Sequence, residues 1–199
     1  MGNSSNIFDF VDNLFMLSSQ TKSKIYVINY RGYGKSKGTP SFSTQFSGNS
    51  LITNEIIQKQ NKLDFIIGFS LGSVFASYSA LESKTDALYL LAPFSNTKEL
   101  FKYFKKQNTR GIKALFRPFI KFSADDYLLN VSNTEKIKSY KGKLIIMHGN
   151  ADKQLPYFMG QSLYKKSISL DKELITIDNG EHWSPMLQAN WKMLINKIK

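Results

Sequence analysis

The chain has 199 residues, of which 42% are hydrophobic and 14% aromatic, and it contains no cysteine. This length and composition suit one globular domain and exclude a disordered chain, a disulfide framework and a cysteine nucleophile. The formal net charge is +12. Because only two histidines are present, strong ligand sets are scarce, and neither a metal nor a cofactor is expected.

No apolar run approaches the roughly 20 residues that a helix needs to cross a bilayer. The first residues, Met1 to Ser5, are polar and lack the basic region of a signal peptide. The absence of cysteine fits a reducing compartment. We therefore expect a cytoplasmic protein, with contact at a membrane surface as its closest approach to lipid.

Strand and helix signals alternate along the chain. The first half predicts, in order, a helix at 6–18, a strand at 24–29, a polar loop at 35–49, a helix at 50–61, a strand at 63–69, a helix at 71–83 and a strand at 87–91. The second half predicts a strand at 143–148, a helix at 155–168, a strand at 172–178 and a helix at 184–198. Repeated strand–helix units predict a parallel sheet with helices on both faces.

Residues 94–141 break this alternation with helical, basic and aromatic segments. We predict that they form a small helical cap, inserted into a single domain that spans residues 1–199. The basic residues between Lys98 and Lys121 face only one acidic residue, Glu99. This segment is either a solvated helical face or a surface attracted to anionic lipid headgroups, where each basic residue contributes about 1 kcal/mol. Nucleic-acid binding is not expected, because no reading motif accompanies the charge.

The stretch Gly68-Phe69-Ser70-Leu71-Gly72 lies between a predicted strand and a predicted helix. A Gly-x-Ser-x-Gly run at a sharp strand-to-helix turn is the nucleophile elbow of serine hydrolases. Small residues two positions before and after the serine avoid collisions with neighbouring backbone. The alternative is an ordinary turn, which the flanking strand and helix make less favourable.

A nucleophilic serine needs a base beside it, and the base needs an acid that orients it. Asp152 follows the predicted strand at 143–148, and His182 follows the predicted strand at 172–178. The order Ser70, Asp152, His182 is the order of the α/β-hydrolase fold. Since the carboxyl ends of parallel strands meet at one edge of a sheet, we predict a catalytic triad there.

His148 and Glu181 compete for the same roles. His148 stands at a strand end before a glycine turn, where a supporting hydrogen bond to the loop is the favoured interpretation. Glu181 adjoins His182 in sequence, so its side chain should point away from the imidazole. Both rank below the chosen pair.

Three stretches resemble the α/β-hydrolase superfamily, and more narrowly its ABHD-type, Bem-like branch, which includes protein depalmitoylases and small esterases. They are Ile28–Ser36, Gly68–Gly72, and Ile145–Asp152 together with Gly180–His182. The resemblance implies a three-layer fold with a mostly parallel sheet of about five strands. It also implies that Ser70 is the nucleophile, that His182 acts as base and then acid, and that Asp152 orients it.

The resemblance further implies two oxyanion-hole donors. One is the backbone N–H of Leu71. The second lies where this branch reads His-Gly-Asn, and Met1-Gly2-Asn3 is similar to that motif, which makes Asn3 the candidate.

The chain departs from the branch in two respects. Asn29 replaces an acidic residue, and the chain begins where the family has completed three strands. The family's third strand lies between its fourth and fifth, so without it both neighbours would lack ladder bonds. Either the strand at 24–29 pairs directly with 63–69, or Met1 is an internal methionine of a longer protein. We expect the second.

The leading hypothesis for function is a serine hydrolase that cleaves a carboxylic ester or thioester through an acyl-enzyme. A small-peptide hydrolase is a close variant. From another class comes a truncated, catalytically impaired remnant that binds a membrane surface or a protein.

Overall fold

The structure is a computed structural model, and it describes residues 7–107 and 130–199. Its strands are β1 (Phe65–Phe69), β2 (Ala87–Leu91), β3 (Lys143–Gly149) and β4 (Lys172–Ile177). Its α-helices are α1 (Val11–Thr21), α2 (Phe42–Gln60), α3 (Gly72–Glu82), α4 (Thr97–Gln107), α7 (Asn133–Ile137), α8 (Phe158–Lys166) and α9 (Gln188–Ile198). Short 3-10 helices span Ile7–Phe10 and Ser184–Met186.

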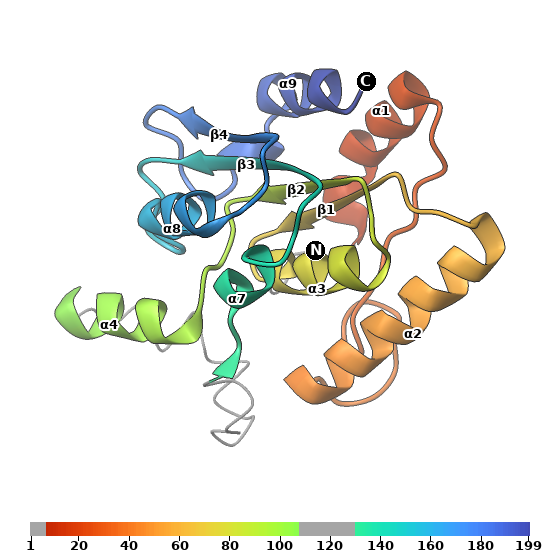
Figure 1. The fold of residues 1–199 in the computed structure, drawn as a ribbon, viewed down its shortest axis with the longest axis horizontal. Helices are drawn as coiled ribbons and strands as arrows, with labels where there is room; N and C mark the ends of the chain where they lie inside the picture. Colours follow the sequence, from red (N-terminus) through yellow and green to blue (C-terminus); the bar gives the residue numbers. More distant parts are fainter. Residues whose placement is uncertain (1–6, 108–129) are drawn as a thin grey trace.

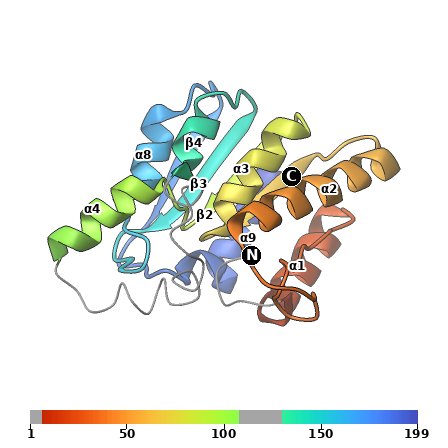
Figure 2. The ribbon, with the colours of Figure 1, turned by 90° about the horizontal axis from the view of Figure 1, so that it is seen from below.

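The four strands form one parallel sheet in the order β1-β2-β3-β4. Alternate residues of a strand face opposite sides of a sheet. Tyr89 and Leu91 pack into a cluster with Leu17 and Trp191, beneath α1 and α9. Leu88 and the other strand residues that face the opposite side of the sheet pack against α3, α7 and α8. Figures 1 and 2 show the resulting three layers, which confirm the predicted fold class.

A further layer of aromatic side chains joins α2 to the outer side of α3. The rings of Phe46 and Phe75 lie 4.7 Å apart, and those of Phe42 and Phe75 lie 6.2 Å apart. The polar loop predicted at 35–49 is therefore too long, because α2 begins at Phe42. The Ser41 hydroxyl caps the helix by accepting a hydrogen bond from Thr44 N–H at 3.2 Å.

Residues 94–141 are predicted to form a cap. Those that the structure describes lie in two different places, one away from the sheet and one in the core. α4 extends away from the sheet (Figure 1). By contrast, Ile137 in α7 and Tyr140 after it are buried in the cluster beneath the sheet. The segment from α7 onward thus contributes to the core around β2 and β3.

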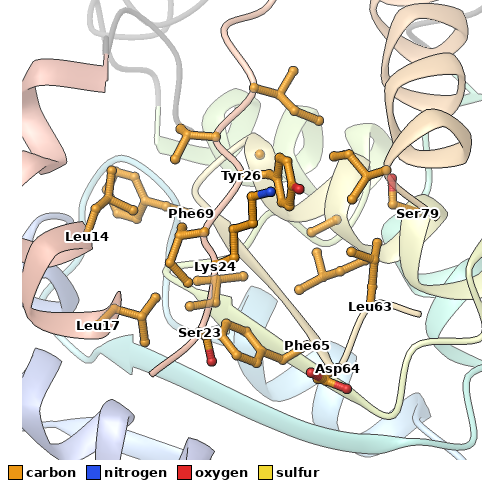
Figure 3. Close-up of a pocket in the computed structure, with 18 of the residues that line it drawn as sticks. Leu14, Leu17, Ser23, Lys24, Tyr26, Leu63, Asp64, Phe65, Phe69 and Ser79 are labelled. Carbon is orange, nitrogen blue, oxygen red and sulfur yellow. The ribbon is translucent and has the colours of Figure 1, made fainter. Parts of the chain in front are cut away.

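The strand predicted at 24–29 is absent from the structure, where these residues form no sheet pairing. A cavity of about 600 Å³ separates residues 21–28 from residues 63–67. Figure 3 shows Lys24 and Tyr26 on one side of this space and Phe65 on the other. An apolar run becomes a strand only when a neighbouring backbone completes its ladder, and the cavity keeps that neighbour out of reach.

The ladder between β1 and β2 determines which groups of β1 face the cavity. Ser70 N–H donates to Leu91 O at 2.8 Å, and Ala87 N–H donates to Asp64 O at 3.3 Å. Because successive residues of a strand point their backbone groups to opposite edges, the even-numbered residues of β1 bond β2. The N–H groups of Phe65, Ile67 and Phe69 point to the other edge, where the described residues supply no acceptor.

This alternation predicts that protection of the amide protons from exchange alternates from one residue to the next along β1. The N–H groups of Phe65, Ile67 and Phe69 should exchange with solvent faster than those of Ile66 and Gly68, because only the latter two are bonded within the ladder. NMR-detected hydrogen exchange measures each amide separately. Equal protection at odd and even positions would contradict an unpaired outer edge of β1.

Candidate active site

Three predicted residues meet at the carboxyl edge of the sheet. Ser70 follows β1, Asp152 lies in the loop after β3, and His182 lies in the loop after β4. All three side chains belong to residues that are at most 7% exposed. Their burial matters because a hydrogen bond between charged or polar groups strengthens when water is excluded.

Ser70 occupies a strained turn between β1 and α3. Its φ angle is +54°, in the left-handed region that a residue with a side chain rarely adopts. Its N–H is held by Leu91 O at 2.8 Å. A Cβ on Gly68 would lie 2.6 Å from the Cβ of Ala76 and 2.7 Å from the Cα of Ser73. The first glycine of the motif is therefore required so that α3 can pack directly against β1.

The loops that carry Asp152 and His182 are joined through their backbones. A Cβ on Gly149 would lie 2.1 Å from Gly180 O, so the two loops touch at a glycine. Ala151 N–H donates to Gly180 O at 2.9 Å, and Asn150 N–H donates to Ile177 O at 3.1 Å. These contacts fix the spacing between the two loops and hence between their functional side chains.

The three side chains form a continuous chain of hydrogen bonds. His182 Nε2 lies 2.9 Å from Ser70 Oγ, and His182 Nδ1 lies 2.7 Å from Asp152 Oδ2. The second carboxylate oxygen, Oδ1, accepts from the N–H groups of Gln154 at 2.8 Å and Leu155 at 2.9 Å. The carboxylate is thus held at both oxygens.

Electrostatics determine where the protons lie in this chain. Burial raises the pKa of the Asp152 carboxyl, but hydrogen bonds from His148, His182 and Leu155 N–H outweigh it, and the pKa falls to about 2. The ionised carboxylate only accepts hydrogen bonds, so His182 Nδ1 carries a proton. His182 Nε2 is then free to accept the Ser70 hydroxyl proton.

A group of aromatic rings lies beside the imidazole of His182. The Phe69 ring centroid lies 5.2 Å from that of His182 and 4.9 Å from that of Trp183. Phe10 stacks on Trp183 at 6.0 Å. The cavity beside β1 shares Phe10 and Phe69 with this aromatic group, but none of the three triad residues is among the described residues that line it.

The remaining predicted residues are placed as follows. Leu71 follows Ser70 directly and is the N-cap residue of α3, so its N–H is beside the serine. Asn3 lies outside the described residues. Glu181 is exposed, and its N–H donates to Ser184 Oγ at 2.8 Å. His148 is completely buried and bonds the loop at Leu155 O, at 2.8 Å. Within residues 7–107 and 130–199, no cluster of acidic and histidine side chains could hold a metal ion.

Comparison with known proteins finds relatives of low sequence identity. No protein-family model matches the chain. The chain is 26% identical over 167 residues to lysophosphatidylserine lipase ABHD12 of Macaca fascicularis. This alignment covers 76% of this chain and 39% of that protein. It is 28% identical over 146 residues to protein ABHD12B of Homo sapiens, in an alignment that covers 69% of this chain and 40% of that protein.

A solved structure shares the fold over nearly the whole chain. The monoacylglycerol lipase of Paleococcus ferrophilus matches with a TM-score of 0.70 and 16% identity, over 99% of this chain and 91% of that one. The chain is thus similar in sequence to ABHD-type proteins and shares the α/β-hydrolase fold. The chain spans about two-fifths of the length of the two curated relatives named above.

Two features of this α/β-hydrolase site escaped the sequence analysis. His148 Nε2 lies 3.3 Å from Asp152 Oδ2, in addition to its bond to the loop. Phe69, the residue before the serine, packs on the histidine ring. The spacing of four residues between His148 and Asp152 was a usable signal for the first contact. The second depends on how two loops distant in sequence meet, which no local pattern encodes.

Packing at the elbow predicts opposite effects for two glycine substitutions. Gly68→Ala should lower the free energy of unfolding by about 1–3 kcal/mol, because the added methyl group overlaps α3. Gly48→Ala is the matched control. Gly48 lies inside α2, and apart from its chain neighbours and the backbone of its own helix no atom lies within 4 Å of the added group, so alanine should stabilise the chain by about 0.5–1 kcal/mol. Urea unfolding measures both, and a neutral Gly68→Ala would contradict the close approach.

The low pKa of Asp152 predicts an acid-dependent loss of stability. The folded state favours the ionised carboxylate, so its contribution is complete above the unfolded pKa of about 4 and is lost as the pH falls toward 2. The difference in unfolding free energy between the parent and Asp152→Asn should therefore shrink over that interval. Urea unfolding of both proteins at several pH values tests this. A difference independent of pH would show that the carboxylate titrates normally.

Proposed function

We propose that the chain is a serine hydrolase that cleaves a carboxylic ester or thioester through a Ser70–His182–Asp152 triad. The observation that carries this proposal is the continuous chain of hydrogen bonds from Ser70 Oγ to the Asp152 carboxylate. A serine hydroxyl is a weak nucleophile until a base receives its proton. Here the base is in contact, and its other nitrogen is held by a buried anion.

The proposed reaction begins at Ser70. Its oxygen attacks the substrate carbonyl while its proton passes to His182 Nε2, and the imidazolium is stabilised by Asp152. The N–H of Leu71 is proposed to donate to the oxygen anion that forms, with Asn3 as the second donor. Each such donor is typically worth about 3–4 kcal/mol of the barrier. His182 then protonates the leaving group, and water hydrolyses the acyl-enzyme with His182 again as base.

Two observations support a lipid-like acyl substrate. The similar proteins named above include a lysophosphatidylserine lipase and a monoacylglycerol lipase. Next to His182 in sequence, Trp183 packs against Phe69 and is 43% exposed, which leaves a large apolar side chain open to a ligand. We therefore propose an ester or thioester with an apolar acyl chain, and no cofactor.

We also propose that the basic segment from Lys98 to Lys121 contacts anionic membrane surfaces. In its described part, Lys98, Phe101 and Lys102 are exposed on one side of α4, with an aromatic ring beside two cations. Basic and aromatic side chains together favour the interface of an anionic bilayer. Among the helices that the structure describes, none has the length and apolar character needed to span a bilayer.

One observation favours a second function, that of an impaired remnant. The proposed nucleophile directly follows β1, yet the outer edge of this strand has no ladder partner among the described residues. A strand held on one side only is easier to displace, and misplacement of an oxyanion donor would lower turnover while the triad remained. Such a chain would bind a lipid surface or a protein without catalysis.

Labelling with a fluorophosphonate probe distinguishes the two functions. The parent chain should react at Ser70, and Ser70→Ala should remove the label and reduce hydrolysis of p-nitrophenyl butyrate by about 10⁴-fold or more. Ser47→Ala, which changes an exposed serine on α2, is the matched control and should leave both signals unchanged.

A folded parent chain that neither labels nor hydrolyses acyl esters would contradict the enzymatic proposal. If that chain retained binding to anionic vesicles, the remnant would be the better description. Labelling that persisted in Ser70→Ala would mean that another residue is the nucleophile.

A further inference from the structure

A second histidine lies behind the proposed triad. His148 ends β3 with its side chain fully buried, and its ring meets the ring of Tyr157 at 5.8 Å in an edge-to-face arrangement. α8 approaches the ring closely at Gly160, where a Cβ would lie 2.6 Å from His148 Nδ1. The helix thus packs directly against the imidazole and leaves it little freedom to turn.

The contacts of His148 determine its tautomer. Nε2 lies 2.8 Å from Leu155 O, and because a carbonyl only accepts, Nε2 carries the proton. Nδ1 is buried and has no hydrogen-bond partner among the described residues. A proton there would be an unsatisfied buried donor, so the ring is neutral, with a single N–H that points at the loop after β3.

The same N–H reaches the proposed catalytic acid. His148 Nε2 is 3.3 Å from Asp152 Oδ2, the oxygen that accepts from His182 Nδ1 at 2.7 Å. Asp152 Oδ1 accepts from Leu155 N–H, whose own carbonyl accepts from His148. His148, Asp152 and Leu155 therefore form a closed set of contacts that fixes both the loop and the rotation of the carboxylate.

A role confined to packing does not account for this ring. An apolar side chain of similar size would fill the space without an orphaned buried nitrogen, which costs free energy. What the imidazole adds is one N–H at the place where both Leu155 O and Asp152 Oδ2 are within reach. His182, by contrast, contacts Ser70 Oγ, so His148 acts on the reaction only through Asp152.

We propose that His148 is a positioning residue that aims Asp152 Oδ2 at His182, a role that rests on the proposed serine hydrolase. Without its N–H, the carboxylate loses one of the donors that hold Oδ2 in place. The bond to His182 Nδ1 then weakens, and with it the alignment of Nε2 to the serine. Substrate binding, which does not involve this contact, is unaffected.

Substitutions of His148 whose side-chain amides extend to different positions separate a positioning role from a packing role. The side-chain amide of glutamine extends to the Nε2 position, whereas that of asparagine extends only to the Nδ1 position. With p-nitrophenyl butyrate, His148→Asn and His148→Phe should lower kcat by about 10- to 100-fold with KM nearly unchanged, the loss expected for one hydrogen bond to a charged group. His148→Gln should keep kcat within about threefold of the parent.

Tyr140→Phe is the control for a general loss of stability. The Tyr140 hydroxyl donates to Thr85 O at 3.0 Å in the core beneath the sheet. Its removal costs a buried hydrogen bond of comparable kind but should leave kcat unchanged. If His148→Phe fails to fold, the asparagine and glutamine pair still makes the comparison. Equal kcat in His148→Asn and His148→Gln would overturn the proposal.

An NMR measurement separates this proposal from the proposed function. A histidine N–H bonded to a carboxylate gives a low-field proton signal, and the His182 signal is observable without turnover. It should shift or broaden in His148→Asn and persist in His148→Gln and Tyr140→Phe. If the parent is as inactive as Ser70→Ala, the hydrolase proposal fails, and an unchanged signal in His148→Asn would still overturn the positioning role.

Discussion

The site depends on one buried anion, the carboxylate of Asp152. A charge removed from water is costly unless hydrogen bonds replace its hydration, and here four donors do so. Two backbone N–H groups hold Oδ1, while His148 and His182 share Oδ2. The arrangement makes the ionised form favourable at neutral pH and thereby determines the tautomer of His182. The direction of the proton path from Ser70 follows from it.

The strain at Ser70 is the second requirement, and the sheet supplies the support for it. A positive φ at a residue with a side chain costs of order 1–3 kcal/mol. It persists only when several surrounding contacts hold the residue in that conformation. The bond from Ser70 N–H to Leu91 O holds the turn from β2, and the close contact of Gly68 with α3 holds it from the helix. The serine is therefore presented by packing on two sides.

Local sequence patterns predicted what depends on neighbours close in the chain. The strand before Ser70, the helix after it and the strands before Asp152 and His182 follow from apolar runs that β2 and β3 complete as ladders. Residues 24–29 carry an equally apolar run but form no strand, because a ladder partner is a long-range property that the run does not contain. Similarly, the contact of His148 with Asp152 depends on how a loop folds back, and sequence spacing only permits it.

The triad is aligned by backbone bonds that start at the inner edge of β1, the edge that pairs with β2. The unpaired outer edge of β1 therefore need not prevent assembly of the site. Ser70 is tied to β2 through Leu91 O, β2 is tied to β3 by Ala92 N–H donating to Met147 O at 2.8 Å, and the loop after β3 is tied to β4 through Asn150 N–H. These backbone bonds form one lateral series at the carboxyl ends of the strands. The relative positions of the three side chains thus depend on the inner ladders. The outer edge of β1 instead governs how firmly the strand is held, which concerns the stability of the elbow more than its geometry.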